Sequence, residues 1–119
     1  MRIRWFSLVP VAAIALLAGP TAAQIERVSL SDDEQPANGG SYAAAVSDDG
    51  ALVAFRSNAD NLVPGDTNGL PDIFVRDVQA GTTEQVSLRP DGQPATDFSK
   101  VPSISGGGRF VAFEAKHPT

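Results

Sequence analysis

The residues best suited to bind an ion lie in a loop at positions 60–72, which is rich in Asn, Asp, Gly and Pro. Asn68 follows Asp66 by two residues, and Asp72 follows it by six. Oxygen ligands placed close together on a tight loop are what calcium prefers. The spacing therefore makes Asp66, Asn68 and Asp72 candidate ligands of a calcium ion.

The same loop also departs from known calcium motifs. Leu70 stands where a further oxygen ligand is expected, and Gly69 does not fall at the glycine position of an EF-hand. In the alternative interpretation, Asn68 and Gly69 form a turn, and Asp66 and Asp72 accept hydrogen bonds from backbone N–H groups within it. The missing oxygen ligand favours the turn. Calcium is the only cofactor that the sequence suggests.

Other side chains that could carry out catalysis lack partners. The acidic clusters Asp32–Glu34 and Asp48–Asp49 could serve glycoside cleavage if they met, but each is also typical of a solvated turn. His117 is the only histidine and has no supporting cluster nearby. Ser105 lacks both the glycine two residues before it and the strand-to-helix setting of a nucleophile elbow. We therefore expect no catalytic residues, and a protein that is not an enzyme.

The elements that position these residues are defined by an internal repeat. Residues 28–57 align without a gap to residues 86–115, an offset of 58 residues, and 13 of the 30 aligned positions are identical. A fixed period of this size predicts a supersecondary unit that stacks on copies of itself to bury its faces.

One unit is predicted to contain four short antiparallel strands. Asp48–Gly50 has the Asp-Gly signature of a hairpin turn, and both faces of the following segment are apolar, as expected for a strand covered on both sides. The strands of this unit are predicted at 43–47, 51–57, 72–78 and 83–88. No helix is expected after residue 23.

Further strands are predicted at 25–30, 102–105 and 109–115. Antiparallel units of four strands with apolar inner strands are typical of propeller blades, so we expect an all-β fold with one full blade at about 43–88 and a partial second blade at 102–115. The apolar positions predicted to be buried are Val53, Phe55, Ile73, Val75, Val111 and Phe113.

Two stretches resemble a known family. Residues 101–113, and residues 51–57 followed by 72–77, are similar to the "P-x-x-S-x-D-G-x-x-[IVL]-A-F" and "D-I-[FY]-[VL]-x-D" segments of TolB-like propeller repeats. The resemblance covers about residues 25–115, with Gly106-Gly107 in place of the acidic turn and Ala44 in place of the proline. It implies a propeller fold, in a family that includes periplasmic scaffolds, sugar-cleaving enzymes and domains that gate peptidases.

The first 23 residues have the pattern of a secretory signal peptide. A basic head at 1–4 precedes an apolar run at 5–17, and small residues at 21–23 fit cleavage after Ala23. The run is shorter than the roughly 20 residues of a membrane span, although an uncleaved anchor is the alternative. We expect an exported protein, periplasmic or extracellular and not membrane-integral, whose propeller part covers residues 24–119.

Composition limits the partners. Without residues 1–23 the chain keeps 7 Lys and Arg against 14 Asp and Glu, a net charge of −7, which argues against nucleic acid and anionic lipid. It has no cysteine, so its core must come from repetition or from a partner chain. Because propellers have about 4–8 blades, fewer than two blades predicts the N-terminal piece of a longer protein, or alternatively self-association.

These observations favour an interaction scaffold that binds a protein or carbohydrate partner. One alternative is the N-terminal part of a propeller enzyme acting on sugars or peptides. Another is a surface repeat stabilised by calcium.

Overall fold

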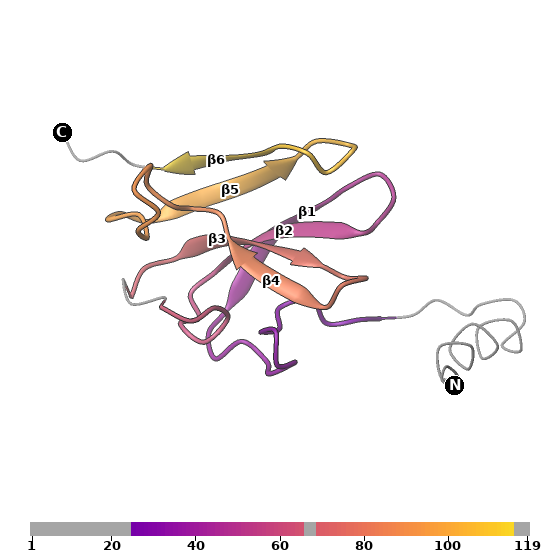
Figure 1. Ribbon diagram of the computed structural model, residues 1–119, viewed down its shortest axis with the longest axis horizontal. Coiled ribbons are helices and arrows are strands. Elements are labelled where there is room, and N and C mark those ends of the chain that lie inside the picture. Colours follow the sequence, from indigo (N-terminus) through magenta and orange to yellow (C-terminus); the bar gives the residue numbers. More distant parts are fainter. Residues whose placement is uncertain (1–24, 66–68, 116–119) are drawn as a thin grey trace, which may run out of the picture.

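The computed structural model describes residues 25–65 and 69–115, and within them every regular element is a strand (Figure 1). The six strands are β1 (Ser41–Val46), β2 (Leu52–Ser57), β3 (Asp72–Asp77), β4 (Thr82–Gln85), β5 (Ser99–Ile104) and β6 (Val111–Ala115). The fold is all-β, as expected from the sequence.

Strands that follow one another in the chain pair antiparallel in two sheets. One sheet has four strands in the order β1-β2-β3-β4, and the other consists of β5 and β6. The turn between β1 and β2 contains Gly50, whose φ is 73°, a left-handed conformation that glycine adopts without steric penalty. The Asp-Gly turn predicted from the sequence is thus confirmed.

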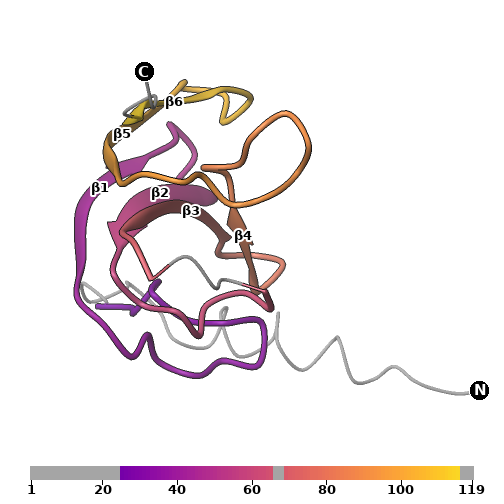
Figure 2. The ribbon, with the colours of Figure 1, turned by 90° about the vertical axis from the view of Figure 1, so that its left-hand side faces the viewer.

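The molecule has three layers. In Figures 1 and 2 the four-stranded sheet lies between the β5–β6 hairpin on one side and the indigo N-terminal segment on the other. The hairpin packs through β5 against β2, β1 and β3. Because both faces of β2 and β3 are covered, their side chains can be apolar on both sides.

The first face of the sheet carries the main core. Phe55 and Phe74 are cross-strand partners whose ring centroids lie 5.8 Å apart. Ala59 and Leu62, from the loop after β2, cover these rings, with Ala37 from the N-terminal segment at the margin. This core therefore depends on loop residues as much as on strands.

The second face is covered by the hairpin. Ala54 and Ile73 are fully buried there. Gly108, in the turn between β5 and β6, has a φ of 73°, and a Cβ atom on it would lie 2.6 Å from Cδ1 of Leu52. A side chain at position 108 would therefore require the Leu52 side chain to move and would strain the left-handed backbone.

The β1–β2 and β5–β6 hairpins have the same backbone plan. Each is irregular in the middle, after Tyr42 and after Lys100, and each has a residue of positive φ there, Ala43 at 55° and Val101 at 43°. Every cross-strand pair of the second hairpin lies 58 residues after a pair of the first; the pairs are Ser41↔Ser57, Tyr42↔Arg56, Ala45↔Ala54 and Val46↔Val53, and then Ser99↔Ala115, Lys100↔Glu114, Ser103↔Ala112 and Ile104↔Val111.

Some expectations about strands were wrong. Residues 25–30 form no strand, and Leu30 makes only an isolated bridge to Pro36. The predicted strand 83–88 is shorter, because β4 ends at Gln85 and Leu88 turns to bridge Pro94. Leu30 N–H donates to Val28 and Leu88 N–H donates to Val86, both within tight turns, whereas Val86 N–H still donates to the carbonyl of Ile73 in β3.

Burial also differs from expectation at three positions. Val53, Phe55 and Ile73 are buried as predicted, but Val75, Val111 and Phe113 are only half-buried. The reason is geometric, since a two-stranded hairpin covers only part of a four-stranded sheet.

Candidate functional site

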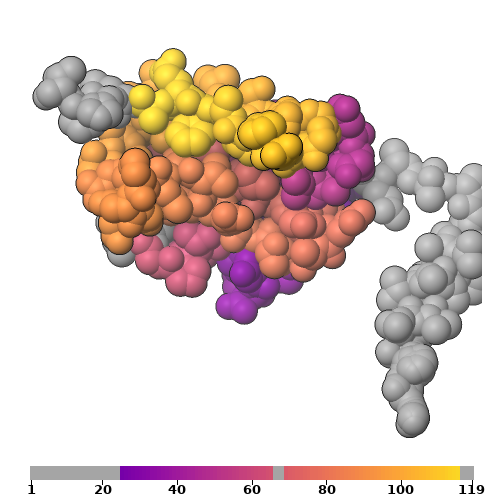
Figure 3. All heavy atoms as spheres, turned by 45° about the horizontal axis from the view of Figure 1, so that its top comes forward, coloured from indigo at the N-terminus to yellow at the C-terminus, as the bar shows by residue number. Residues whose placement is uncertain are grey.

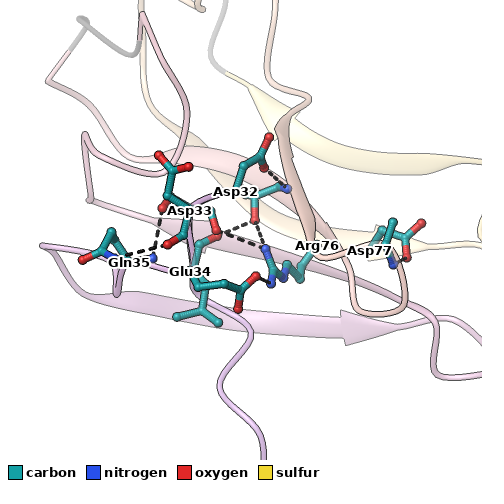
Figure 4. Close-up of polar contacts among 10 residues, drawn as sticks. Asp32, Asp33, Glu34, Gln35, Arg76 and Asp77 are labelled. Atoms are coloured by element: carbon teal, nitrogen blue, oxygen red, sulfur yellow. Dashed lines mark hydrogen bonds and ion pairs between the residues drawn. The ribbon is translucent and has the colours of Figure 1, made fainter. Parts of the chain in front are cut away.

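The acidic cluster at 32–34 lies beside the buried Arg76 of β3 (Figure 4). The guanidinium Nη1 donates to the carbonyl oxygen of Ser31 (3.3 Å) and to Oγ1 of Thr83 (3.2 Å). Its Nη2 forms an ion pair of 2.6 Å with Oε1 of Glu34. A buried cation is therefore matched by a carboxylate and two neutral oxygens, as its desolvation requires.

The carboxylate of Asp32 also accepts a hydrogen bond. Oδ1 of Asp32 accepts a hydrogen bond of 2.7 Å from the backbone N–H of Thr83, and the Thr83 hydroxyl donates to the carbonyl of Leu30. We call the segment Leu30–Glu34 together with Arg76 and Thr83 the Arg76 clamp. Asp32 and Glu34 thus both accept bonds that fasten the N-terminal segment to β3 and β4.

The residue that forms the ion pair of the clamp has an unusual backbone conformation. Glu34 has a φ of 60°, a left-handed conformation that is unfavourable for residues with a Cβ. At the position 58 residues later the chain has Gly92, with a φ of 82°. The conformation suits glycine, and Glu34 adopts it where its carboxylate reaches Arg76.

The second acidic cluster caps the turn between β1 and β2. Oδ1 of Asp49 accepts hydrogen bonds from the N–H of Ala51 (3.0 Å) and the hydroxyl of Ser47 (2.7 Å), and these bonds lower the pKa of Asp49. The N–H of Asp48 donates to the carbonyl of Gly106 (2.8 Å), and a Cβ at Gly106 would lie 2.4 Å from the Asp48 carboxylate. Gly106 thus leaves room for the side chain of Asp48.

The two acidic clusters do not come together. Figures 1 and 2 both place the turn between β1 and β2 well away from the N-terminal turn that carries Asp32. Ser105 has a structural role too, since its Oγ accepts a hydrogen bond of 3.0 Å from the N–H of Phe110.

The candidate calcium ligands are described only in part. Asp72 is buried at the start of β3, where its Oδ1 accepts a hydrogen bond of 2.7 Å from the hydroxyl of Ser87. Asp66 and Asn68 lie outside the described residues, as do His117 and the signal peptide predicted at 1–23. Within residues 25–65 and 69–115, no group of three or more His, Cys, Asp or Glu side chains is placed to hold a metal ion.

A groove of about 300 Å³ lies where the hairpin leaves the larger sheet uncovered. Figure 3 shows the yellow end of the chain as a ridge above the salmon part of the chain that contains β3 and β4. The groove is lined by Leu52, Val75, Asp77, Thr82, Glu84, Val86, Gly108, Arg109 and Val111. It combines an apolar floor with charges of both signs at its rim.

Comparison with protein-family models, with curated proteins and with solved structures gave no match. Among the described residues, no helix is both long enough and apolar enough to cross a membrane. The candidate function therefore has to be argued from the geometry of this chain alone.

Sequence reasoning missed Arg76 and the groove. The signal for Arg76 was present, because an arginine inside the apolar strand 72–78 must find acceptors, and acidic residues lie upstream. The groove had no comparable signal, since it depends on how the two sheets overlap.

Proposed function

We propose that the chain consists of TolB-like propeller repeats and acts, as an exported protein, as an interaction scaffold without catalytic activity. The observation that carries the proposal is the match between the two hairpins. They share register and irregularity at an offset of 58 residues, and the second covers a face of the sheet to which the first belongs. Stacking of repeated antiparallel units is how propeller blades bury their faces.

The scaffold role rests on where polar and apolar groups lie. Of the carboxylates that were candidates for catalysis, Asp49 caps a turn, Glu34 pairs with Arg76, and Asp32 accepts a bond from the N–H of Thr83. Large apolar side chains stand exposed. Exposed apolar side chains offer surface that a protein partner can cover. The exposed residues are Ile25, Tyr42, Val46, Leu88, Val101 and Phe110.

Site-specific photocrosslinking in the cells that make the protein tests the scaffold role. A photoreactive amino acid at Phe110, which is 64% exposed, is expected to capture a partner as a discrete adduct. The same amino acid at the exposed Thr96 is the control and should give no such adduct. Absence of any adduct at Phe110, or equal adducts at both sites, contradicts the proposal.

Export has its own test. N-terminal sequencing of exported protein is expected to begin at Gln24, as cleavage after Ala23 requires. An exported fraction that retains Met1 contradicts cleavage.

A further inference from the structure

The edge of β6 that faces away from β5 has no strand paired to it within residues 25–65 and 69–115. The carbonyl of Phe110 accepts a hydrogen bond from Ser105 N–H (2.9 Å) and so faces the β5 side. Because backbone groups alternate along a strand, the N–H and C=O groups of Val111, Phe113 and Ala115 point to the open edge. These groups form a template for another strand.

The other strand edges are protected, and β6 is not. The edges of β1 and β5 are irregular in the middle, and β5 also carries Lys100 and Pro102. The edge strand β4 has only four residues. Short strands, bulges, lysine and proline are the devices that prevent edge pairing. The five residues of β6 include no lysine, no proline and no bulge.

The groove extends this edge into a binding surface. Its floor includes Val75 and Val86, which are half-buried because the hairpin stops short of them. A strand added to β6 would lie over this floor and bury those side chains. The acidic Asp77 and Glu84 stand at the rim together with the basic Arg109, so the groove offers two carboxylates to a basic incoming side chain.

The molecule contains its own example of such a pairing. Val53-Ala54-Phe55 of β2 recurs as Val111-Ala112-Phe113 of β6. The corresponding edge of β2 is occupied by β3, with Val53 opposite Arg76 and Phe55 opposite Phe74. A strand with the sequence pattern of β3, Asp-Ile-Phe-Val-Arg-Asp, therefore fits the edge of β2 that corresponds to the open edge of β6.

We propose that the groove binds an extended segment of another polypeptide, which adds to β6 as an antiparallel strand with the sequence pattern of β3. The segment places an aromatic residue opposite Phe113 and a basic residue opposite Val111. Val111 lines the groove with Asp77 and Glu84, and directly opposed side chains lie on the same face of a sheet, so the basic residue meets the two carboxylates. The proposal rests on the scaffold function and names the site through which it acts.

The probe for the test is a peptide with the sequence of residues 70–79, added to the full chain. In β3, Phe74 and Arg76 lie opposite β2 residues whose backbone groups face β3, whereas the carbonyl of Ile73 accepts from Val86 N–H on the β4 side. N-methylation of the peptide at its Phe74 and Arg76 positions should therefore weaken binding at least about tenfold, because two hydrogen bonds to β6 are lost. N-methylation at the Ile73 and Val75 positions is the matched control and should leave affinity within about twofold.

Fluorescence anisotropy of the labelled peptides measures these affinities. Equal weakening by both methylation patterns, or no saturable binding, overturns strand addition. The edge of β6 could instead be occupied by β6 of a second copy of the chain, and sedimentation of the chain alone tests this alternative. A dimer that excludes the peptide would show such pairing and would also overturn the proposal.

Charge reversal tests the basic residue separately. Glu84→Lys is expected to weaken binding of the unmodified peptide about tenfold, and a peptide with Glu at its Arg76 position should recover affinity for this variant. Glu26→Lys, at an exposed position that does not line the groove, is the control. A photocrosslinked partner at Phe110 together with failure of the peptide tests would leave the scaffold function standing and reject the strand.

Discussion

The β1–β2 and β5–β6 hairpins are built alike but lie in different surroundings. In the turn of each, a serine hydroxyl accepts a backbone N–H, Ser47 from Leu52 and Ser105 from Phe110. Yet Ala54 is fully buried, whereas Ala112, at the same place in the second hairpin, is exposed. The backbone plan thus follows from local residues, whereas burial follows from what packs against each hairpin.

The turns that precede the two hairpins differ in the same way. Residues 31–35 and 89–93 have matching backbone hydrogen bonds, from Ser31 N–H to Gln35 and from Arg89 N–H to Gln93. The first turn is fastened by the Arg76 clamp, whereas in the second Arg89 pairs with Asp91 at the surface. Two turns with the same local geometry therefore differ in their tertiary contacts, because the first is bonded to β3 and β4 and the second is held by an ion pair of its own residues.

The largest difference is expected between the two equivalent phenylalanines. Phe55→Ala should lower the free energy of unfolding by about 3–5 kcal/mol, because the ring is 2% exposed and stacks on Phe74. Phe113→Ala should lower it by less than about 2 kcal/mol, because its ring is only half-buried. Urea denaturation measures both, and equal losses would mean that the two hairpins are packed alike.

The two arginines that hold the turns give the next contrast. Arg76→Met should lower the free energy of unfolding by about 1.5–3 kcal/mol, since it removes hydrogen bonds made by a buried charge. Arg89→Met should change it by no more than about 0.5 kcal/mol, because its ion pair with Asp91 is exposed. A comparable effect of both substitutions in denaturant titrations would refute a structural role specific to the clamp.

Position 34 separates backbone strain from the ion pair. Glu34→Ala and Glu34→Gly both remove the carboxylate, but only glycine accepts a φ of 60° without strain. We expect the glycine variant to be about 1 kcal/mol more stable than the alanine variant in thermal or chemical unfolding. The reverse order would show that the left-handed conformation is not retained.

One buried hydroxyl sharpens the comparison further. The Ser41 hydroxyl donates to Oγ of Ser57 (2.9 Å), but Ala115 stands in the place of Ser57 in the second hairpin. The buried Ser99 hydroxyl has no hydrogen-bond partner among residues 25–65 and 69–115. Ala115→Ser should raise the free energy of unfolding by about 0.5–1 kcal/mol by supplying an acceptor. The same substitution in a Ser99→Ala background should give no gain, and a gain there would rule out this explanation.

The smallest effect concerns pH. Hydrogen bonds from Ala51 and Ser47 lower the pKa of Asp49 below its ordinary 3.8, and the equivalent residue of the second hairpin is Gly107. The ionised carboxylate therefore stabilises the fold above pH 3.8, and this contribution disappears as pH falls through the lowered pKa. The stability difference between the chain and Asp49→Ala should shrink from pH 7 to pH 2; a constant difference would contradict it.

The sequence was most informative where local chemistry decides the structure. The Asp-Gly turn and the apolar strand that follows it were predicted closely, because glycine at Gly50 and the apolar residues on both faces of β2 leave few alternatives. The segment at 25–30 was predicted as a strand from its similarity to 83–88, but the carbonyl of Leu30 accepts from the Thr83 hydroxyl, and the next carbonyl, that of Ser31, accepts from Arg76. Periodicity cannot reveal such partners.

The candidate site was less predictable still. Burial at Val75 and Val111 depends on how far one sheet overlaps another, which no spacing of residues encodes. The candidate calcium ligands Asp66, Asn68 and Asp72 were proposed from spacing alone, and of these the described residues include only Asp72, which is bonded to Ser87.

The Arg76 clamp has a consequence for how the chain folds. The bonds from the clamp to the N-terminal segment join residues 42 to 53 positions apart, from Glu34–Arg76 to Leu30–Thr83. Closing a loop of that length costs about 3.5 kcal/mol in chain entropy from the logarithmic term alone. The bonds of the clamp offset this cost only once β3 and β4 are in place, so we expect the clamp to form late in folding. Its removal should speed unfolding while leaving the folding rate nearly unchanged.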